Sequence, residues 1–464
     1  MSLAYKTAIE LRGLLAARDI SPVELVEDTL SRQEALEPKI NAFVTRTPEI
    51  ALEAARAQER AIAAGEAGAI AGLPTSVKDL VAMAGVPWTF GSRPFADNVV
   101  DFDAPAVERV RAAGGCIVGK STTSEFGCKA VCDSPLTGIT RNPWNLAKTP
   151  GGSSGGGAAS VAAGLTPFAV CTDGGGSVRI PSALCGLFGI KAQFARVPVF
   201  PVSAAPTLAH VGAIARTVRD AALLLGVMAG HDRRDAFGVA EPVPDFLAAC
   251  DAGAKGLRIG WSPTLGYAQP EPEIVALCEA AARRFEALGC EVELVEDALG
   301  EDPVETWMAE FYGGIGTKLK GLMTERPEEL DPAVVTTLSG GLDRSMVEFF
   351  TQVFARYDFR EKMRQLFERY DLLLSPTLPC AAFDVGHDTP PGLGARNIVS
   401  WVYYTYPFNL TGQPAASIPA GFTAEGLPVG LQMVAGINRE VDILRAAAAF
   451  EEAAPWADRK PPLA

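Results

Sequence analysis

The sequence predicts an α/β fold: a single large domain in which a central mixed, largely parallel sheet is covered by helices. Two observations support this prediction. From residue 73 onward, short apolar segments with strand character alternate with helical patterns, and such alternation is typical of parallel α/β sheets. The chain has 464 residues, of which 48% are hydrophobic and 21% are charged, so it can bury a large core. We therefore expect one domain over residues 1–464.

The first half of the chain divides into a helical part and a core. Residues 1–65 hold three helical patterns, one of which begins at Ser21-Pro22 with Glu24 three residues after the cap. This pattern indicates the start of a helix, because it combines a serine N-cap, a proline at the first helical position and an acidic third residue. In the core, residues 70–230, we expect strands at 73–78, 116–120, 168–172 and 186–191, and helices at 104–113 and 216–228.

The second half continues the same pattern after an interruption. Residues 230–256 are polar and contain several Asp and Pro residues, so we interpret them as a surface connection. Residues 257–464 are expected to complete the sheet with strands at 257–261, 290–295, 372–375, 415–419 and 428–434, and a helix at 271–288. The segment 300–370 has a helical pattern with little strand character and is expected to cover one end of the sheet.

Composition excludes several classes of partner. The formal net charge is −14, and we find no basic stripe of the kind that binds nucleic acid. No segment approaches 18 uninterrupted apolar residues, so we expect no membrane contact. The charged N-terminal segment predicts an amphipathic helix and not a signal peptide. The nine cysteines contain no CxxC pair, and we interpret them as reduced thiols of a cytoplasmic protein.

The three histidines, His210, His231 and His387, show no zinc-ligand spacing, so we expect no metal and no cofactor. His210 lies in an apolar context that favours a structural role.

Residues 114–121 match the P-loop pattern GxxxxGK[ST] letter by letter. A true P-loop follows a strand and opens a helix. Here a helical pattern ends at Gly114, a typical C-terminal glycine, and a strand follows. We therefore reject nucleotide binding by Lys120.

Two serines stand in runs of glycine: Ser153 in residues 151–157 and Ser177 in residues 174–177. Glycine permits backbone conformations and close approaches that a Cβ forbids, so a serine there can be exposed beside free peptide N–H groups. An acyl-transfer enzyme needs such a nucleophile and such donors. The alternative is a pair of flexible glycine-serine linkers. The sequence around these serines alone leaves both interpretations open.

A nucleophilic serine also needs a base, and Lys78 at the end of the strand 73–78 is a candidate. Strand alternation places Asp79 on the opposite face, so the two neighbours do not form an ion pair. Burial disfavours the charged form of lysine and lowers its pKa, and a neutral lysine can act as a general base. The alternative interpretation is a surface lysine at a strand end.

Three segments together resemble the amidase signature family: residues 73–79 (LPTSVKD), 150–156 (PGGSSGG) and 172–181 (TDGGGSVRIP). Further matches occur in order at 114–126, 140–144, 210–212, 216–221 and 427–432, so the resemblance covers nearly the whole chain. It implies a Ser-Ser-Lys triad in which Ser177 is the nucleophile, Ser153 relays the proton after a cis bond to Gly152, and Lys78 is the base. It also implies an oxyanion hole of peptide N–H groups, those of Gly174, Gly175, Gly176 and Ser177.

Other residues receive supporting interpretations. Thr172 and Asp173 are expected to hold the glycine turn by hydrogen bonds, Ser154 to join the same network, and Arg179 to have a structural role. Cys171 is interpreted as a core residue. A thiol nucleophile at Cys128 or Cys132 is a minor alternative. Six residues are candidates for lining the acyl pocket, with core packing as the alternative for each: Trp88, Phe90, Phe126, Cys132, Phe311 and Trp401.

The resemblance predicts an amidase that hydrolyses a carboxylic amide to a carboxylate and ammonia or an amine through an acyl-Ser177 intermediate. The first alternative is the glutaminase-type A subunit of an aminoacyl-tRNA amidotransferase, for which Arg356 is a candidate substrate-binding arginine. A second alternative is a non-catalytic α/β binding protein. The expected partner is a small-molecule amide substrate, and a homodimer is one option for the assembly.

Overall fold

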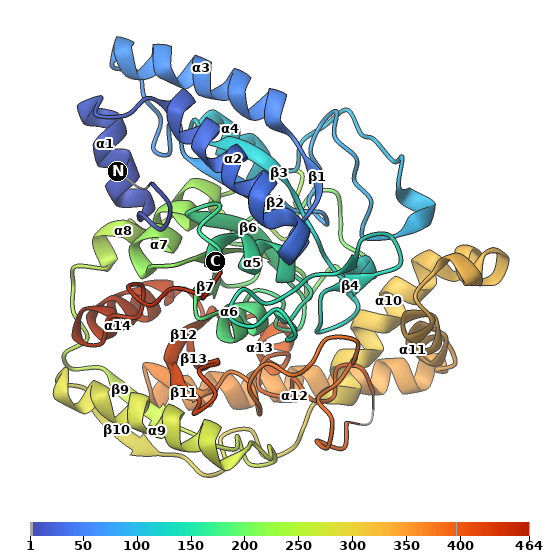
Figure 1. Cartoon of the computed structure of the whole chain (residues 1–464). Helices are drawn as coiled ribbons and strands as arrows, with labels where there is room; N and C mark the ends of the chain where they lie inside the picture. The colour runs from blue at the N-terminus through green and yellow to red at the C-terminus, as the bar shows by residue number, and fades with distance from the viewer. Residues whose placement is uncertain (1–2, 396, 464) are drawn as a thin grey trace.

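The computed structural model describes residues 3–395 and 397–463, and it confirms the α/β class (Figure 1). Within these residues one eleven-stranded sheet runs through the molecule with helices on both faces. In sheet order its strands are β1 (Phe43–Arg46), β3 (Cys116–Ser121), β2 (Pro74–Lys78), β6 (Phe168–Asp173), β8 (His210–Ala215), β7 (Phe188–Lys191), β12 (Ala415–Phe422), β13 (Pro428–Ala435), β11 (Leu372–Pro376), β9 (Arg258–Trp261) and β10 (Glu291–Leu294). A separate small ribbon pairs β4 (Asp133–Ser134) with β5 (Gly138–Ile139).

The sheet is mixed. Parallel pairs form two groups, β3–β2–β6 and β11–β9–β10. Between these groups β8, β7, β12 and β13 pair antiparallel, as does β1 at the edge. The centre is antiparallel because the connections from β7 to β8 and from β12 to β13 return without a helix, and only parallel neighbours need a crossover helix. Strand β8 and edge strand β1 were not among the expected strands.

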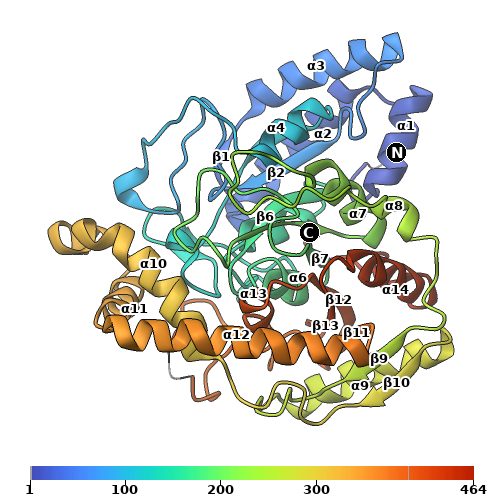
Figure 2. The same ribbon diagram turned by 180° about the vertical axis from the view of Figure 1, so that it is seen from behind.

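The helices confirm the expected segments and add several short ones and a longer one at the C-terminal end. They are α1 (Ala8–Ala17), α2 (Pro22–Ile40), α3 (Pro48–Ala64), α4 (Pro105–Ala112), α5 (Gly155–Ala162), α6 (Arg179–Cys185), α7 (Val218–Met228), α8 (Phe246–Ala249), α9 (Pro272–Ala287), α10 (Val304–Glu325), α11 (Pro332–Leu342), α12 (Met346–Arg369), α13 (Pro407–Leu410) and α14 (Glu440–Ala453). Ser21 caps α2 in a capping box with Glu24, as the sequence predicts. The helical segment 300–370 forms α10, α11 and α12, which lie together beside the sheet (Figure 2). No helix of the described residues is long and apolar enough to cross a membrane.

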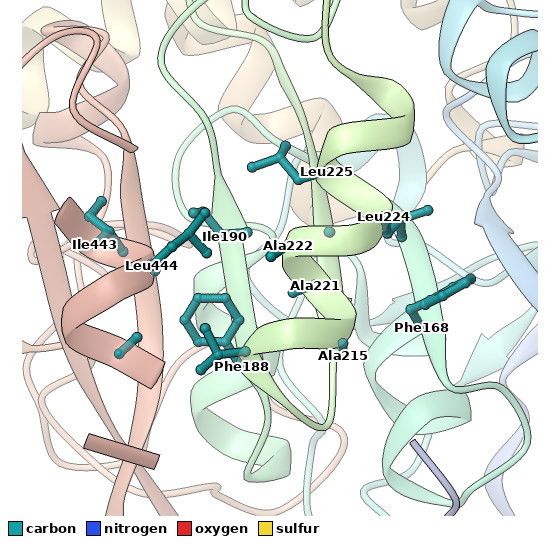
Figure 3. Close-up of a cluster of buried hydrophobic side chains, with 14 of the residues drawn as sticks. Phe168, Phe188, Ile190, Ala215, Ala221, Ala222, Leu224, Leu225, Ile443 and Leu444 are labelled. Carbon is teal, nitrogen blue, oxygen red and sulfur yellow. The ribbon is translucent and has the colours of Figure 1, made fainter. Parts of the chain in front are cut away.

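The core lies on both faces of the sheet. Along β6, Phe168 and Val170 point to the face covered by α7 and α14, whereas Ala169 and Cys171 point to the face covered by α5 and α6. On the first face, large side chains from β6, β7, α7 and α14 pack together in the cluster shown in Figure 3. On the second face, a Cβ on Gly157 would lie 2.7 Å from Cys171 Sγ. The glycines that open α5 therefore allow this helix to pack closely on the sheet.

Candidate active site

The structure brings Lys78, Ser153 and Ser177 into one chain of hydrogen bonds. Lys78 Nζ donates to Ser153 Oγ at 2.8 Å, and Ser153 Oγ donates to Ser177 Oγ at 3.0 Å. Lys78 is the last residue of β2, Ser153 lies in the turn before α5, and Ser177 follows β6 in the turn before α6. The peptide bond between Gly152 and Ser153 is cis. Ser177 is partly exposed, while the other two side chains are buried.

Lys78 has the environment that a lysine base requires. Its side chain is fully buried, and burial lowers the pKa of the ammonium group from 10.5 to about 8, although Cys171, Cys132 and Asp173 oppose this shift. The neighbouring Asp79 pairs with Lys120 and not with Lys78, as strand alternation predicts. A substantial fraction of Lys78 is therefore neutral near pH 8, and a neutral amine can accept a proton from Ser153.

Lys120 does not belong to a phosphate site. Its Nζ donates to Asp79 Oδ1 at 2.9 Å, and both side chains are fully buried. Helix α4 precedes Lys120, and Lys120 itself lies within β3, so the element order of a P-loop is inverted. The lysine that matches the nucleotide-binding pattern therefore forms a buried ion pair, which joins β3 to the residue that follows β2.

The turn that carries Ser177 is held by the carboxylate of Asp173. Its oxygens accept hydrogen bonds from the N–H groups of Gly176 at 2.8 Å and Val178 at 3.1 Å. The structure differs here from the sequence prediction, because the Gly176 N–H is engaged by this carboxylate and is not free for an oxyanion. Within the described residues no acceptor binds the N–H groups of Gly174, Gly175 or Ser177.

Two residues that the sequence did not single out as supports hold successive peptide groups of this turn, and the first of these groups carries the free N–H of Gly175. Trp307 Nε1 donates to the carbonyl of Gly174 at 2.8 Å, and Thr405 Oγ1 donates to the carbonyl of Gly175 at 2.6 Å. A Cβ on Gly175 would lie 2.7 Å from Trp307, so the turn is pressed against the indole. The glycines are required here by close packing and not by flexibility.

Asp173 is itself held by a buried polar network. Arg179 donates to both carboxylate oxygens, at 2.8 and 3.0 Å, and Asn409 Nδ2 donates to one of them at 2.9 Å. Burial alone would raise the pKa of Asp173, but the Arg179 guanidinium and Asn409 hold it well below its usual range. Arg179 also donates to Gln432 Oε1 and to the carbonyl of Thr405, each at 2.8 Å. These contacts agree with the structural role predicted for Arg179.

The remaining supporting residues fall near the triad. Ser154 Oγ donates to the carbonyl of Thr172 at 3.1 Å, which ties the two serine turns together. The Thr172 side chain lines the cavity described below. His210 is buried, and its Nδ1 lies 2.8 Å from the carbonyl of Leu208, which agrees with the structural role predicted for it. Among the described residues, no group of His, Cys, Asp or Glu side chains is placed to hold a metal ion.

The thiol alternative does not fit the site. Cys128 and Cys132 are both buried, and burial raises the pKa of each thiol. Cys132 Sγ contacts the hydroxyl groups of Thr122 and Thr140. Neither cysteine lines the cavity that reaches Ser177. A buried, protonated thiol is a poor nucleophile, so the serines remain the candidates.

A cavity of about 460 Å³ opens onto Ser153 and Ser177. Four of the six predicted pocket residues line it, namely Trp88, Phe90, Phe126 and Phe311, together with Phe95 and Phe200, which the sequence did not suggest. The prediction is wrong for Cys132 and Trp401. Trp401 is buried and packs edge-on against Phe383.

The ionic groups of the cavity are few. Apart from the buried Asp173 and His210, Lys318 on α10 is the one ionisable side chain among the described lining residues. Arg356 does not reach the cavity. It is buried, forms an ion pair with Glu310 and donates to the carbonyl of Leu410 at 2.7 Å. The arginine that the glutaminase alternative needs is therefore occupied by contacts away from the cavity.

The fold and the cavity-facing serines define a class, the hydrolases that act on amides, and comparison with known proteins gives the same class. The chain belongs to the amidase signature family: the family model described as Amidase matches residues 24–444. It is 38% identical to an acylamidase of Rhodococcus erythropolis over 99% of this chain and 98% of that protein. It is 36% identical to the A subunit of the glutamyl-tRNA(Gln) amidotransferase of Methylococcus capsulatus, with 98% of both chains covered. The crystal structure of a bacterial aryl acylamidase of the same family superposes with a TM-score of 0.92 at 33% identity and covers 98% of both chains.

Proposed function

We propose that this chain hydrolyses neutral carboxylic amides through an acyl-Ser177 intermediate. Ser177 Oγ attacks the carbonyl carbon, its proton passes to Ser153, and the proton of Ser153 passes to neutral Lys78. Hydroxyl hydrogens rotate freely, so the hydrogen-bond chain through Ser153 can run in the direction that this step needs. The observation that supports the proposal most directly is the continuous Lys78–Ser153–Ser177 chain, with links of 2.8 and 3.0 Å.

The second half of the reaction reverses the proton path. As the tetrahedral intermediate collapses, the C–N bond breaks, and Ser153 gives a proton to the departing nitrogen while Lys78 restores it. The product amine leaves, and the acyl group stays on Ser177 as an ester. A water molecule then attacks this ester and gives a proton through Ser153 to Lys78. As the second tetrahedral intermediate collapses, the bond between the acyl carbon and Ser177 Oγ breaks, and the proton returns from Lys78 through Ser153 to Ser177 Oγ. The carboxylic acid leaves and loses its own proton to solvent.

The negative oxygen of each tetrahedral intermediate is assigned to the free N–H groups of Gly174, Gly175 and Ser177. Trp307 binds the carbonyl of the peptide group that carries the Gly175 N–H, and Thr405 and Asp173 hold the next peptide group of the same turn. The turn is therefore fixed before substrate arrives. Donors that need no reorganisation stabilise a developing oxyanion most strongly, and the loss of one typically costs about 3 kcal/mol.

We assign an apolar, preferably aromatic, amide as the substrate. The cavity is lined mainly by apolar side chains, among them six Trp and Phe residues from four separate segments of the chain. Such a lining gains free energy by covering apolar surface. The glutaminase alternative, represented by the relative from Methylococcus capsulatus, requires recognition of the charged groups of glutamine. The engagement of Arg356 by Glu310 weighs against this alternative.

We also place the chain in the cytoplasm, because its nine cysteines are free and buried.

Covalent labelling tests the nucleophile. A serine-reactive phosphonate should modify the wild-type chain at Ser177, located by mass spectrometry, and Ser177→Ala should lose both labelling and turnover of aromatic anilides. Ser203→Ala is the matched control, because Ser203 lines the same cavity away from the triad. Labelling of Ser177→Ala at Ser153 would reverse the two roles, and faster turnover of glutamine than of anilides would favour the amidotransferase alternative.

A further inference from the structure

Helix α12 carries a row of exposed apolar side chains that the active site does not use. Met346 and Val347 are each 77% exposed, Phe350 is 48%, Phe354 is 65% and Tyr357 is 63% exposed. Figure 2 shows α12 lying along the outside of the molecule. The other large apolar side chains with comparable exposure belong to different elements. We refer to these five residues as the α12 patch.

The spacing of the α12 patch is that of a helix-packing seam. Val347, Phe350, Phe354 and Tyr357 follow one another in steps of three, four and three, so they share one side of the helix. Arg356, on the opposite side, is buried against the molecule. The patch also has a defined end: about two turns beyond Tyr357, Arg364 pairs within the helix with Glu361 and Glu368.

We propose that the α12 patch is the interface of a homodimer in which two copies of α12 pack antiparallel. Interfaces between identical chains are usually two-fold symmetric and self-complementary. A two-fold axis between Phe350 and Phe354 places Phe350 of each copy beside Phe354 of the other. The same axis places Val347 beside Tyr357, so each apolar side chain of the seam meets an apolar side chain.

The charges around the patch fit this arrangement. Asp358 is exposed and has no ion-pair partner within the described chain. With the axis between Phe350 and Phe354, Asp358 lies beside Met346 of the second copy, at the N-terminus of its α12. That end of a helix carries partial positive charge, and Arg344 lies two residues before it, where it also pairs with Glu305. Glu348 caps the same helix end and offsets part of this charge. Asp358 therefore lies beside the N-terminal end of the second α12 and near Arg344, a contact that contributes less than the apolar seam.

The area is sufficient for a reversible dimer. Side chains of this size have about 200 Å² of surface each. With exposed fractions between 48% and 77%, the five residues offer on the order of 600 Å² per copy, or about 1,200 Å² for the pair. Specific interfaces begin at about this size. A lipid surface fits less well, because the patch is bordered by the acidic residues Glu348 and Asp358 in a chain with a net charge of −14.

Sedimentation velocity of the full chain tests the proposal at protein concentrations from about 1 to about 100 µM. The wild-type chain should sediment as a dimer, and Phe354→Glu should raise the dissociation constant about 100-fold or more. Ile437→Glu is the matched control, because Ile437 is 48% exposed and lies between β13 and α14, outside the α12 patch, and it should leave the dimer intact. Asp358→Lys should weaken the dimer to a smaller extent, because it loses one charge contact at each end.

Three results would overturn the proposal: a wild-type chain that stays monomeric throughout this concentration range, a dimer that Phe354→Glu leaves unchanged, or a monomer that binds phosphatidylcholine vesicles through α12. A polar residue at an exposed position should not perturb folding. At nanomolar concentration both the wild-type chain and Phe354→Glu are monomers. Equal amidase activity per chain at that concentration verifies that Phe354→Glu is folded.

Discussion

The pH dependence of amide hydrolysis should follow the protonation of Lys78. Burial lowers the pKa of Lys78 to about 8, and the proposed base is the neutral form, so activity rises with pH. At about pH 6 roughly one Lys78 in a hundred is neutral, and at about pH 7 roughly one in ten. The kcat/KM for a neutral anilide should therefore rise about tenfold per pH unit below pH 8 and level off above it.

The same pKa makes a prediction about stability. Lys78 has a lower pKa in the folded chain than the 10.5 of an unfolded one, so its protonation disfavours folding. This penalty is present in full below about pH 8 and disappears as the pH rises to about 10.5. Lys78→Met should be inactive, yet its free energy of unfolding at about pH 7 should increase by about 2 kcal/mol, after the loss of the hydrogen bond to Ser153.

Lys120→Met is the matched control for this variant. Lys120 is as deeply buried as Lys78, but it forms an ion pair with Asp79. Its removal leaves the Asp79 carboxylate buried without its cation, and the free energy of unfolding should fall by about 3–5 kcal/mol. Denaturant unfolding at two pH values measures both effects. A kcat/KM that stays flat from about pH 5 to about pH 9, or a Lys78→Met chain that is destabilised like Lys120→Met, would refute the neutral-lysine base.

Three further predictions concern the surroundings of the triad. Gly175→Ala introduces a Cβ 2.7 Å from Trp307, so the turn must shift. In steady-state kinetics, kcat should fall about 100- to 1,000-fold, with a smaller change in KM. Arg179→Met leaves the Asp173 carboxylate buried without its cation and should reduce the free energy of unfolding by about 3–5 kcal/mol in a denaturant titration; equal stability would contradict this reasoning. A Cys128→Ala chain should retain turnover and phosphonate labelling, whereas loss of both would revive the thiol alternative.

The local pattern of the sequence predicted most elements to within a few residues. The helix at Ser21-Pro22 and the strand that ends at Lys78 depend on capping, on proline and on short apolar runs, all of which act over a few neighbouring residues. Strand β8 was not predicted, although His210–Ala215 is buried throughout. It follows β7 without an intervening helix, so the alternation that guided the other strands gave no signal there.

The three residues of the hydrogen-bonded chain could be predicted from the sequence, but most of the residues that hold the nucleophile turn by hydrogen bonds could not. Lys78, Ser153 and Ser177 stand out through glycine context and family resemblance, whereas Trp307 and Thr405 are ordinary residues in a helix and a loop. They reach the nucleophile turn across 133 and 230 residues of chain. No local periodicity encodes such contacts, which depend on how distant segments fold over the end of the sheet.

The sequence by itself determined the α/β class, the order of most elements, the family and the three residues of the hydrogen-bonded chain, because these features reside in local patterns and in motifs. Only the tertiary structure decided which peptide N–H groups remain free, since Asp173 engages that of Gly176. It also decided which aromatic residues line the cavity and which side of α12 faces outward. Each of these depends on packing between segments far apart in the chain, where burial and competition for hydrogen bonds determine the outcome.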